Sequence, residues 1–199
     1  MQRFNDANAN THKEATALEI LYKLGAACSE PMRTSLDSAV LEYTHGVIEH
    51  EWPEMANKKY YAGKTGAHKL WSIVLSYRPG DGHEQMLIDK AIDQLNEISQ
   101  ARSQRFLFYG DDLPSVVWMV IYLGCAITIG FSYFFGGDIF RAQAVMCLFF
   151  SILLGMTILA ILELAHPYQG VVTISDQPFR YALGRMQDLA GYKMTKMAP

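Results

Sequence analysis

The chain has 199 residues, of which 50% are hydrophobic, and a formal net charge of −3 at pH 7. This small charge, without a strongly basic segment, excludes the electrostatic pattern of a nucleic-acid-binding protein. The 3 cysteines form no CxxC pair, which argues against a disulfide framework and against a cysteine-based zinc site.

The first part of the chain predicts helices, beginning with one from about Ala7 to Ala27, where apolar residues recur at helical spacing. The segment Cys28–Pro31 breaks this helix, and Ser29 is the expected N-cap of the next one. The apolar face of the second helix consists of Met32, Leu36, Val40, Tyr43 and Val47. This helix is expected to end at Trp52–Pro53, because a residue before proline avoids the α region.

Two more helices are predicted before the chain becomes apolar. Thr65 is expected to cap a short helix, and a turn at Arg78–Gly82 separates this helix from a long one. The apolar residues of the short helix are Leu70, Trp71, Val74 and Leu75. The long helix carries one stripe, made of Ile88, Ala91, Leu95, Ile98 and Arg102. Residues 1–112 are therefore predicted to form a helical bundle in the cytoplasm.

Two long apolar runs predict a membrane hairpin in residues 113–165, with spans at 113–135 and 142–165. The first run has no charged residue, and the second has only Glu163. At about 1.5 Å per residue, each run can cross a hydrocarbon core of about 30 Å. The six residues Gly136–Arg141 between them leave room only for a tight turn. The alternative, a pair of buried helices in a soluble core, is disfavoured because such helices normally carry a polar stripe.

The distribution of lysine and arginine around the spans predicts their orientation. Arg102 and Arg105 precede the first span. The cations after the second span are Arg180, Arg185, Lys193 and Lys196. The connecting turn has only Arg141, which Asp138 offsets. We therefore expect both termini in the cytoplasm, and a bacterial inner membrane as the location.

Residues 166–199 are expected to form a cytoplasmic tail. The segment His166–Gly170 stops the second span, and Val171–Ile174 is prone to β structure. A short amphipathic helix follows, and its apolar side consists of Phe179, Leu183, Met186 and Ala190. This helix is expected to lie on the membrane surface or to pack on the bundle. The predicted fold is an all-α integral membrane protein: a cytoplasmic helical bundle, a two-helix transmembrane hairpin and a short C-terminal amphipathic helix.

Small and hydroxylated residues of the spans are candidates for helix packing or for lining a pore. The hydroxylated ones are Thr128, Ser132, Ser151 and Thr157. Glu163 joins them as the one acid within a span. It lies about one turn from the cytoplasmic end, so an interfacial position, or a pair with His166, competes with a functional role.

No enzyme signature occurs in the chain. Walker, GxGxxG, HExxH and GxSxG motifs are all missing, so we predict no catalytic residue, no cofactor and no enzymatic activity. His45 and Glu49 share a helix face and could ligate a metal ion. A solvated helix face is the preferred interpretation of this pair, and no metal site is predicted.

Four segments, in order along almost the whole chain, carry a resemblance to a known family. They are EATALEILY (Glu14–Tyr22), EYTHGVIEHEWPEM (Glu42–Met55), GFSYFFGGDIFRAQ (Gly130–Gln143) and ELAHPYQGVVTISDQPFRYAL (Glu163–Leu183). Together they resemble the bestrophin-like domain-of-unknown-function family of membrane proteins. The most specific parts are EWP, FSYFFG and HPYQG. Their characteristic residues are Glu51, Trp52, Pro53, Phe131, Gly136, His166, Pro167 and Gly170.

The resemblance implies a distant relation to bestrophins, which are pentameric anion channels, but no channel residue carries over. Family members usually begin with two further transmembrane helices, which this chain lacks. We therefore expect a shortened member, a member completed by another polypeptide, or an incomplete start.

Two functions follow from this interpretation. The first is a subunit of an oligomeric ion channel or pore, with an anion as the implied ion. The alternative is an accessory or scaffolding subunit of a larger membrane complex, without transport activity of its own. Both imply membrane lipids as partners, together with further copies or a larger membrane complex, and neither implies a nucleic acid.

Overall fold

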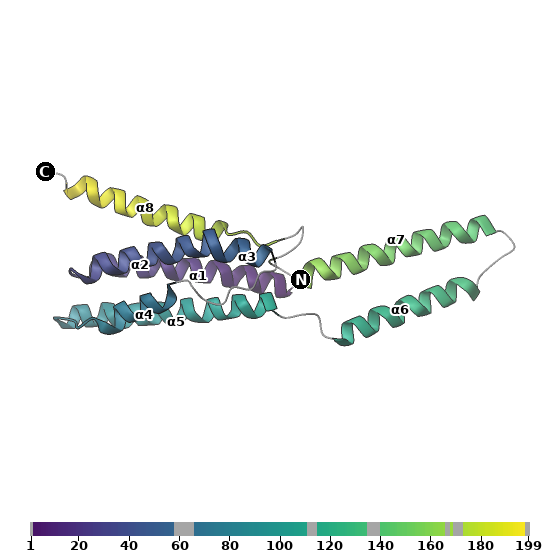
Figure 1. Ribbon diagram of the computed structural model, residues 1–199, viewed down its shortest axis with the longest axis horizontal. Helices are drawn as coiled ribbons and strands as arrows, with labels where there is room; N and C mark the ends of the chain where they lie inside the picture. Colours follow the sequence, from purple (N-terminus) through teal and green to yellow (C-terminus); the bar gives the residue numbers. More distant parts are fainter. Residues whose placement is uncertain are drawn as a thin grey trace.

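The computed structural model describes residues 2–57, 66–110, 115–134, 140–165, 168 and 173–197. In these residues all regular structure is helical and no strand occurs. The elements are α1 (Gln2–Ala27), α2 (Met32–Gly46), the π-helical turn η1 (Val47–Glu51), α3 (Trp52–Ala56), α4 (Ala67–Ser76), α5 (Gly82–Gly110), α6 (Ser115–Phe134), α7 (Phe140–Ala165) and α8 (Gln177–Met197). Figure 1 shows a bundle at one end, from which α6 and α7 project together. The prediction of helices in the first part of the chain is confirmed.

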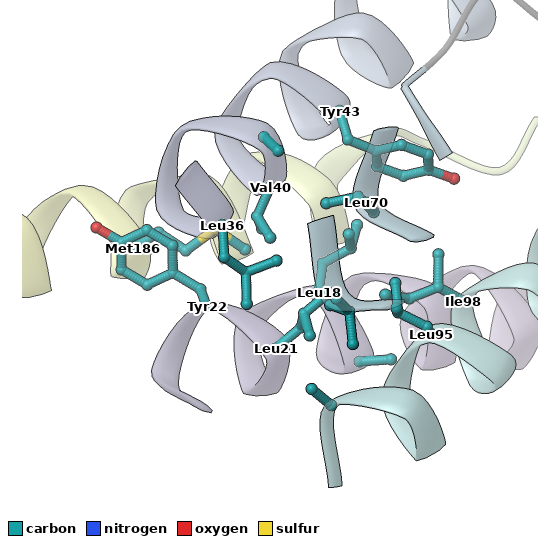
Figure 2. Packing of buried hydrophobic residues seen from close by; sticks show 14 of the residues in the cluster. Leu18, Leu21, Tyr22, Leu36, Val40, Tyr43, Leu70, Leu95, Ile98 and Met186 are labelled. Atoms are coloured by element: carbon teal, nitrogen blue, oxygen red, sulfur yellow. The ribbon is translucent and has the colours of Figure 1, made fainter. Parts of the chain in front are cut away.

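Helix α1 is the central element of the bundle and contacts α2, α5 and α8. Its apolar face meets those of its neighbours in one core (Figure 2). The fully buried aliphatic residues of this core include Leu18, Leu21, Leu36, Val40, Leu70, Leu95 and Ile98. Burying each such side chain contributes about 1.5–3 kcal/mol, so the apolar stripes predicted from spacing account for much of the packing.

The second helix does not stop at Trp52–Pro53 as predicted. The π-helical turn Val47–Glu51 follows α2 directly, and α3 then carries the helix through Pro53 to Ala56. The amide of Trp52 donates to the carbonyl of Val47, five residues earlier. A proline in an α-helix removes one bond to the fourth residue before it and clashes with that carbonyl. In the π-helical turn just before Pro53, the backbone bond reaches the fifth preceding residue and not the fourth. The helix therefore continues through the proline.

One local prediction around the shorter loops was wrong. Ser29 does not cap α2, because its hydroxyl contacts the hydroxyl of Tyr77 and the carboxylate of Glu84. Glu30 instead accepts from the backbone amide of Thr34. Leu75, one of the apolar residues of the short helix, is 66% exposed. Helix α4 packs through Leu70 and Val74, which are one turn apart, and Leu75 lies off that line. The predicted cap Thr65 lies outside the described residues.

Two hydrogen bonds of Glu84 stabilise the start of helix α5. The amide of Glu84 donates to Oδ1 of Asp81 at 2.7 Å, and Oε2 of Glu84 accepts from the amide of Gly80 at 2.8 Å. This arrangement is a variant of the capping box, in which the carboxylate of Glu84 bonds the amide one residue before the N-cap Asp81. The bond from Gly80, followed by bonds from Ser29 and Tyr77, lowers the pKa of Glu84 to about 2.

Stability should therefore depend on pH through Glu84. Because its pKa falls from 4.5, the ordinary value of a glutamate, to about 2 in the folded chain, the carboxylate stabilises the fold above pH 4.5. This contribution is lost as the pH falls toward 2. We expect the melting temperature of wild type to exceed that of Glu84→Gln above pH 4.5, and the gap to narrow in acid. Thermal unfolding of both proteins across this range measures the gap, and a gap that does not change with pH would contradict the prediction.

The two apolar runs form α6 and α7, which pack against each other. Ala144–Ile161 of α7 is long and apolar enough to cross a membrane, with a mean hydropathy of 2.6 and no residue buried inside the chain. Ser115–Phe131 of α6 is also apolar but shorter. A soluble core would bury such helices. The exposure of the described residues of α7 therefore argues against a pair of buried helices in a soluble core. Most of the predicted turn Gly136–Arg141 lies outside the described residues.

Helix α8 packs on the bundle, one of the two places expected for it. It contacts α1 and α2, and its residues Phe179, Ala182 and Met186 are buried in the main core. Leu183 packs against that core as a partly buried residue. The helix has 21 residues and is longer than the short helix predicted. The described residues Thr173 and Ile174 before it do not form a strand.

Candidate functional site

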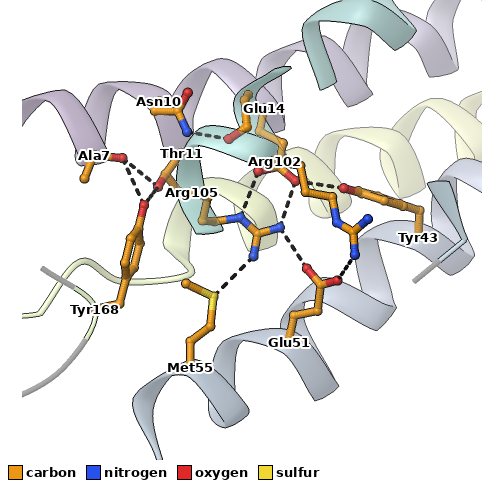
Figure 3. A network of polar contacts seen from close by, with 11 residues as sticks. Ala7, Asn10, Thr11, Glu14, Tyr43, Glu51, Met55, Arg102, Arg105 and Tyr168 are labelled. Atoms are coloured by element: carbon orange, nitrogen blue, oxygen red, sulfur yellow. Dashed lines mark hydrogen bonds and ion pairs between the residues drawn. The ribbon is translucent and has the colours of Figure 1, made fainter. Parts of the chain in front are cut away.

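Four charged side chains gather inside the bundle at the end from which α6 and α7 project. Glu14 comes from α1, Glu51 from the last position of η1, and Arg102 and Arg105 from α5 (Figure 3). Glu14 and Arg105 are 0% exposed and Glu51 is 3% exposed. A buried charge is costly unless it is paired and hydrogen-bonded. We call these four residues, together with Tyr43, the charge network.

The guanidinium of Arg105 joins the two carboxylates. Its Nε and Nη2 donate to Oε2 and Oε1 of Glu14, both at 3.0 Å, and Nη2 also donates to Oε2 of Glu51 at 2.8 Å. The remaining Nη1 lies 3.4 Å from Sδ of Met55. Nη2 of Arg102 binds the other oxygen of Glu51, and the Tyr43 hydroxyl donates to Oε1 of Glu14 at 2.9 Å. Two positive and two negative charges therefore balance within one connected set of bonds.

Aromatic rings surround this guanidinium. The Cζ atom of Arg105 lies 5.3 Å from the ring centre of Phe106, 5.7 Å from that of Trp52 and 5.8 Å from that of Phe179. A cation over an aromatic face gains more when the site excludes water. Trp52 also meets Phe179 at 5.7 Å and Tyr168 edge-on at 5.6 Å between ring centres. The network is thus enclosed by rings from α3, α5, α8 and the segment after α7.

Two members of the charge network, Arg105 and Tyr43, have raised pKa values. Burial alone would lower the pKa of Arg105, but the carboxylates of Glu14 and Glu51 outweigh it and raise that pKa above its ordinary value. Burial, and then the negative charge of Glu14, raise the pKa of Tyr43 well above 10.0. Tyr43 therefore stays a hydrogen-bond donor and Arg105 stays charged. Groups fixed in this way are suited to hold elements together and not to move protons.

The π-helical turn explains how one helix supplies several inward residues. Tyr43, Val47, Glu51 and Met55 follow each other at steps of four, and all four are buried. In a regular α-helix each step of four overshoots one turn by about 40°, so the last of four such residues would rotate away from the first. The wider turn at Val47–Glu51 reduces this drift. Glu51 and Met55 consequently stay on the face that Tyr43 occupies.

A second set of polar contacts fastens the segment after α7. The Tyr168 hydroxyl lies 3.4 Å from the carbonyl of Ala7 and 3.5 Å from Oγ1 of Thr11. One turn further along α1, Nδ2 of Asn10 donates to the carbonyl of Ala101 on α5 at 2.6 Å. Helix α1 thus holds α5 at Ala101 and the chain after α7 at Tyr168 through neighbouring positions.

Sequence reasoning assigned the two arginines of the network to another role. Arg102 and Arg105 were expected to mark the cytoplasmic side of the membrane, but the structure pairs both with buried carboxylates. The sequence did contain a sign of this buried pairing, because Arg105 lies seven residues after Ile98 on the apolar stripe of α5. A charge on a buried stripe indicates a buried partner. Glu14, which precedes the buried Leu18 by one turn, carries the same signal.

The predicted span residues occupy ordinary helical positions. Oγ1 of Thr128 donates to the carbonyl of Gly124, and Oγ1 of Thr157 donates to that of Leu153, both at 2.8 Å. These hydroxyls are therefore satisfied within their own helices, as is common for threonine in apolar helices. Ser151 is exposed on α7. The side chains of Ser132 and Glu163 lie outside the described part of the structure. Whether these residues line a pore or pack against helices stays a prediction.

The family-motif residues divide between two places. Glu51, Trp52 and Pro53 lie in or beside the charge network, and Phe131 is exposed on α6. The remaining ones lie outside the described residues: Gly136, His166, Pro167 and Gly170.

The pair considered as metal ligands lies on the bundle surface. His45 Nδ1 and Glu49 Oε1 are 3.4 Å apart, and both side chains are largely in solvent. Among the residues that the structure describes, no group of three or more His, Cys, Asp or Glu is placed to hold a metal ion.

These features define a class: a helical-bundle protein with a packed ionic junction and an apolar helix of membrane-spanning length. The sequence matches the Bestrophin-like domain over residues 1–179, which covers every helix up to the first residues of α8. The chain therefore belongs to the bestrophin-like family, and the resemblance seen in its motifs is confirmed. No curated protein and no solved structure matches the chain.

Proposed function

We propose that the protein is an integral membrane protein in which α6 and α7 cross the bilayer as a hairpin, and that several copies form an ion channel or pore. The main support is the exposure of α7, because its segment Ala144–Ile161 is strongly apolar and none of it is buried inside the chain. Water would make such a surface costly, whereas lipid covers it. The apolar segment Ser115–Phe131 of α6 is close to the lower limit of about 17 residues for a span.

Assembly of several copies follows from the small size of the hairpin. Two helices cannot enclose an aqueous path, so a pore needs further helices. Gly124 and Gly130 of α6 and Gly155 of α7 have open space beside their backbone. Such positions let another helix approach closely. The family relation alone suggests an anion as the transported ion.

The proposed orientation places both termini in the cytoplasm of a cell with this protein in its inner membrane. It rests on the cations after the second span, because Arg102 and Arg105 are paired inside the bundle, whereas the ion pairs of Arg180 and Arg185 lie at its surface. A cysteine placed at residue 137, in a variant without Cys28, Cys125 and Cys147, tests it. Labelling of that cysteine from the cytoplasmic side alone would overturn the orientation.

The second candidate is an accessory or scaffolding subunit of a larger membrane complex. It is favoured by the composition of α6, whose 20 residues include no charged residue that could select an ion. The buried pairing of Arg105 with Glu14 and Glu51 supports a structural role of the charge network under either proposal, and we propose no enzymatic activity.

Native mass measurement of the gently extracted complex separates the two candidates. For a pore we expect a homo-oligomer of about four or more copies, followed by steady ion flux when it is placed in liposomes. Thr128→Val and Thr157→Val should alter that flux if these residues line the path, and Thr173→Val, an exposed site before α8, is the matched control. A complex with one or two copies of this chain beside a different membrane protein, and no flux, would support the accessory role.

A further inference from the structure

The chain leaves the bundle for the helix pair α6–α7 after α5 and returns to it before α8, and α1 also contacts α7 directly. Helix α5 runs to Gly110 and α6 begins at Ser115, whereas α7 ends at Ala165 and Tyr168 follows it after two residues. Arg105, one turn before the end of α5, is locked into the charge network. Tyr168 is buried against α1. The chain entering the pair and the chain leaving it are thus both fastened to the bundle.

A small apolar cluster, separate from the main core, connects these two fastenings. We call it the junction cluster. Its buried members are Ala7, Met55, Tyr168 and Ile174, and the partly buried residues packed against it are Phe4, Trp52, Phe108 and Tyr109. Phe108 and Tyr109 belong to the last turn of α5, and Ile174 precedes α8. Residues from both connections therefore share one packing environment.

Trp52 is the residue that bridges the cluster and the charge network. Its ring lies 5.7 Å from Cζ of Arg105, 5.6 Å from the ring of Tyr168 and 5.7 Å from the ring of Phe179. These three neighbours precede α6, follow α7 and begin α8, respectively. The π-helical turn immediately before Trp52 sets the direction of α3 and hence of this ring. One side chain therefore contacts Arg105 of α5 before the helix pair, Tyr168 after it and Phe179 at the start of α8.

We infer that Trp52 couples the chain before α6 to the chain after α7 and to α8, so that a displacement on one side of the helix pair is transmitted to the other side and to α8. Packed side chains transmit displacement because they have little free volume in which to absorb it. Without the indole, Arg105 keeps its bonds to Glu14 and Glu51, but the rings of Tyr168 and Phe179 lose their shared neighbour. This inference holds for a pore and for a scaffold alike, since it concerns how the bundle and the helix pair are connected.

Hydrogen exchange of the full chain in lipid nanodiscs tests the inference. In Trp52→Ala we expect amides of the last turn of α5 (106–110) and of the first turn of α8 (177–180) to exchange roughly tenfold faster or more. Amides 36–43 in α2 should keep the wild-type rate. Trp71→Ala is the matched control, because it removes an indole bonded to Ser99 on another side of α5. This control should speed exchange in α4 and leave residues 106–110 and 177–180 unchanged.

A second variant keeps the test decisive if Trp52→Ala fails to fold. Tyr168→Ala removes a ring from the connection after α7 and leaves every bond of Arg105 in place. We expect it to accelerate exchange at 106–110, with Tyr181→Ala, an exposed tyrosine of α8, as its control. Acceleration confined to residues near 168, or spread equally through 36–43, would overturn the coupling role of Trp52.

Discussion

Replacement of Arg105 by methionine is expected to lower the free energy of unfolding by about 3–5 kcal/mol, because removing one partner of a buried ion pair leaves its partner charge uncompensated. Methionine fills much of the vacated space with a flexible apolar chain. The loss of stability therefore comes mainly from the missing charge and not from a cavity. The carboxylate of Glu14, fully buried, loses both bonds that the guanidinium donates to it. Glu51 loses one of its bonds and keeps Arg102.

Denaturant unfolding of the full chain in detergent, followed by circular dichroism, measures this loss. Arg78→Met is the matched control, since Arg78 is exposed and such substitutions usually change stability by about 0.5 kcal/mol or less. Adding Glu14→Gln to Arg105→Met should recover part of the loss, because it removes the uncompensated charge. A cost below about 1 kcal/mol for Arg105→Met would show that the pair is not buried in the folded protein.

Replacement of Phe179 by alanine is expected to cost about 3–5 kcal/mol, the usual range for emptying a phenylalanine site in a core. Phe179 is 0% exposed, packs on Trp52 and lies beside the guanidinium of Arg105. It therefore contributes to the main core and to the wall of the charge network. The substitution tests whether α8 is part of the bundle in solution.

Tyr181→Ala provides the comparison, because Tyr181 lies two residues further along α8 and is 69% exposed. We expect its cost to stay within about 0.5 kcal/mol. Unfolding measured as for Arg105 gives both values. Equal costs for the two substitutions would place α8 away from the core, for example on the membrane surface.

The helices and the main core were predictable because their signal is local. Leu18 and Leu21, or Leu95 and Ile98, recur at helical spacing, and this spacing alone defines a buried face. The same rule identified the apolar side of α8 through Phe179 and Met186. It left open which surface this side would meet, since spacing describes one helix at a time.

The charge network was not predicted, because its partners are far apart in sequence. Arg105 and Glu14 are separated by 91 positions, and only the packing of α5 on α1 brings them together. Considered with its nearest neighbours, Arg105 precedes an apolar run and fits the pattern of a membrane-flanking cation equally well. The position on a buried stripe was the one local sign of a different role.

The π-helical turn escaped prediction for a related reason. The rule that proline ends a helix is local, and it gave Trp52–Pro53 as the end of α2. The turn lets Glu51 bond Arg105 while Met55 stays buried, so contacts with α5 stabilise it. These contacts are far away in sequence and are not visible in residues 47–53 by themselves.

The long separation of Glu14 from Arg105 has a consequence for synthesis. The two residues are 91 positions apart, so at about 5–20 residues per second the ribosome makes Arg105 about 5–18 s after Glu14. During that interval the carboxylate of Glu14 must remain hydrated, and the nascent bundle stays open around it. The apolar residues from Ser115 onward follow Arg105 by ten positions, so their translation begins within about 2 s of the moment at which Glu14 gains its partner. If the helix pair enters a bilayer, as we propose, its synthesis and the closure of the bundle around Glu14 therefore overlap in time.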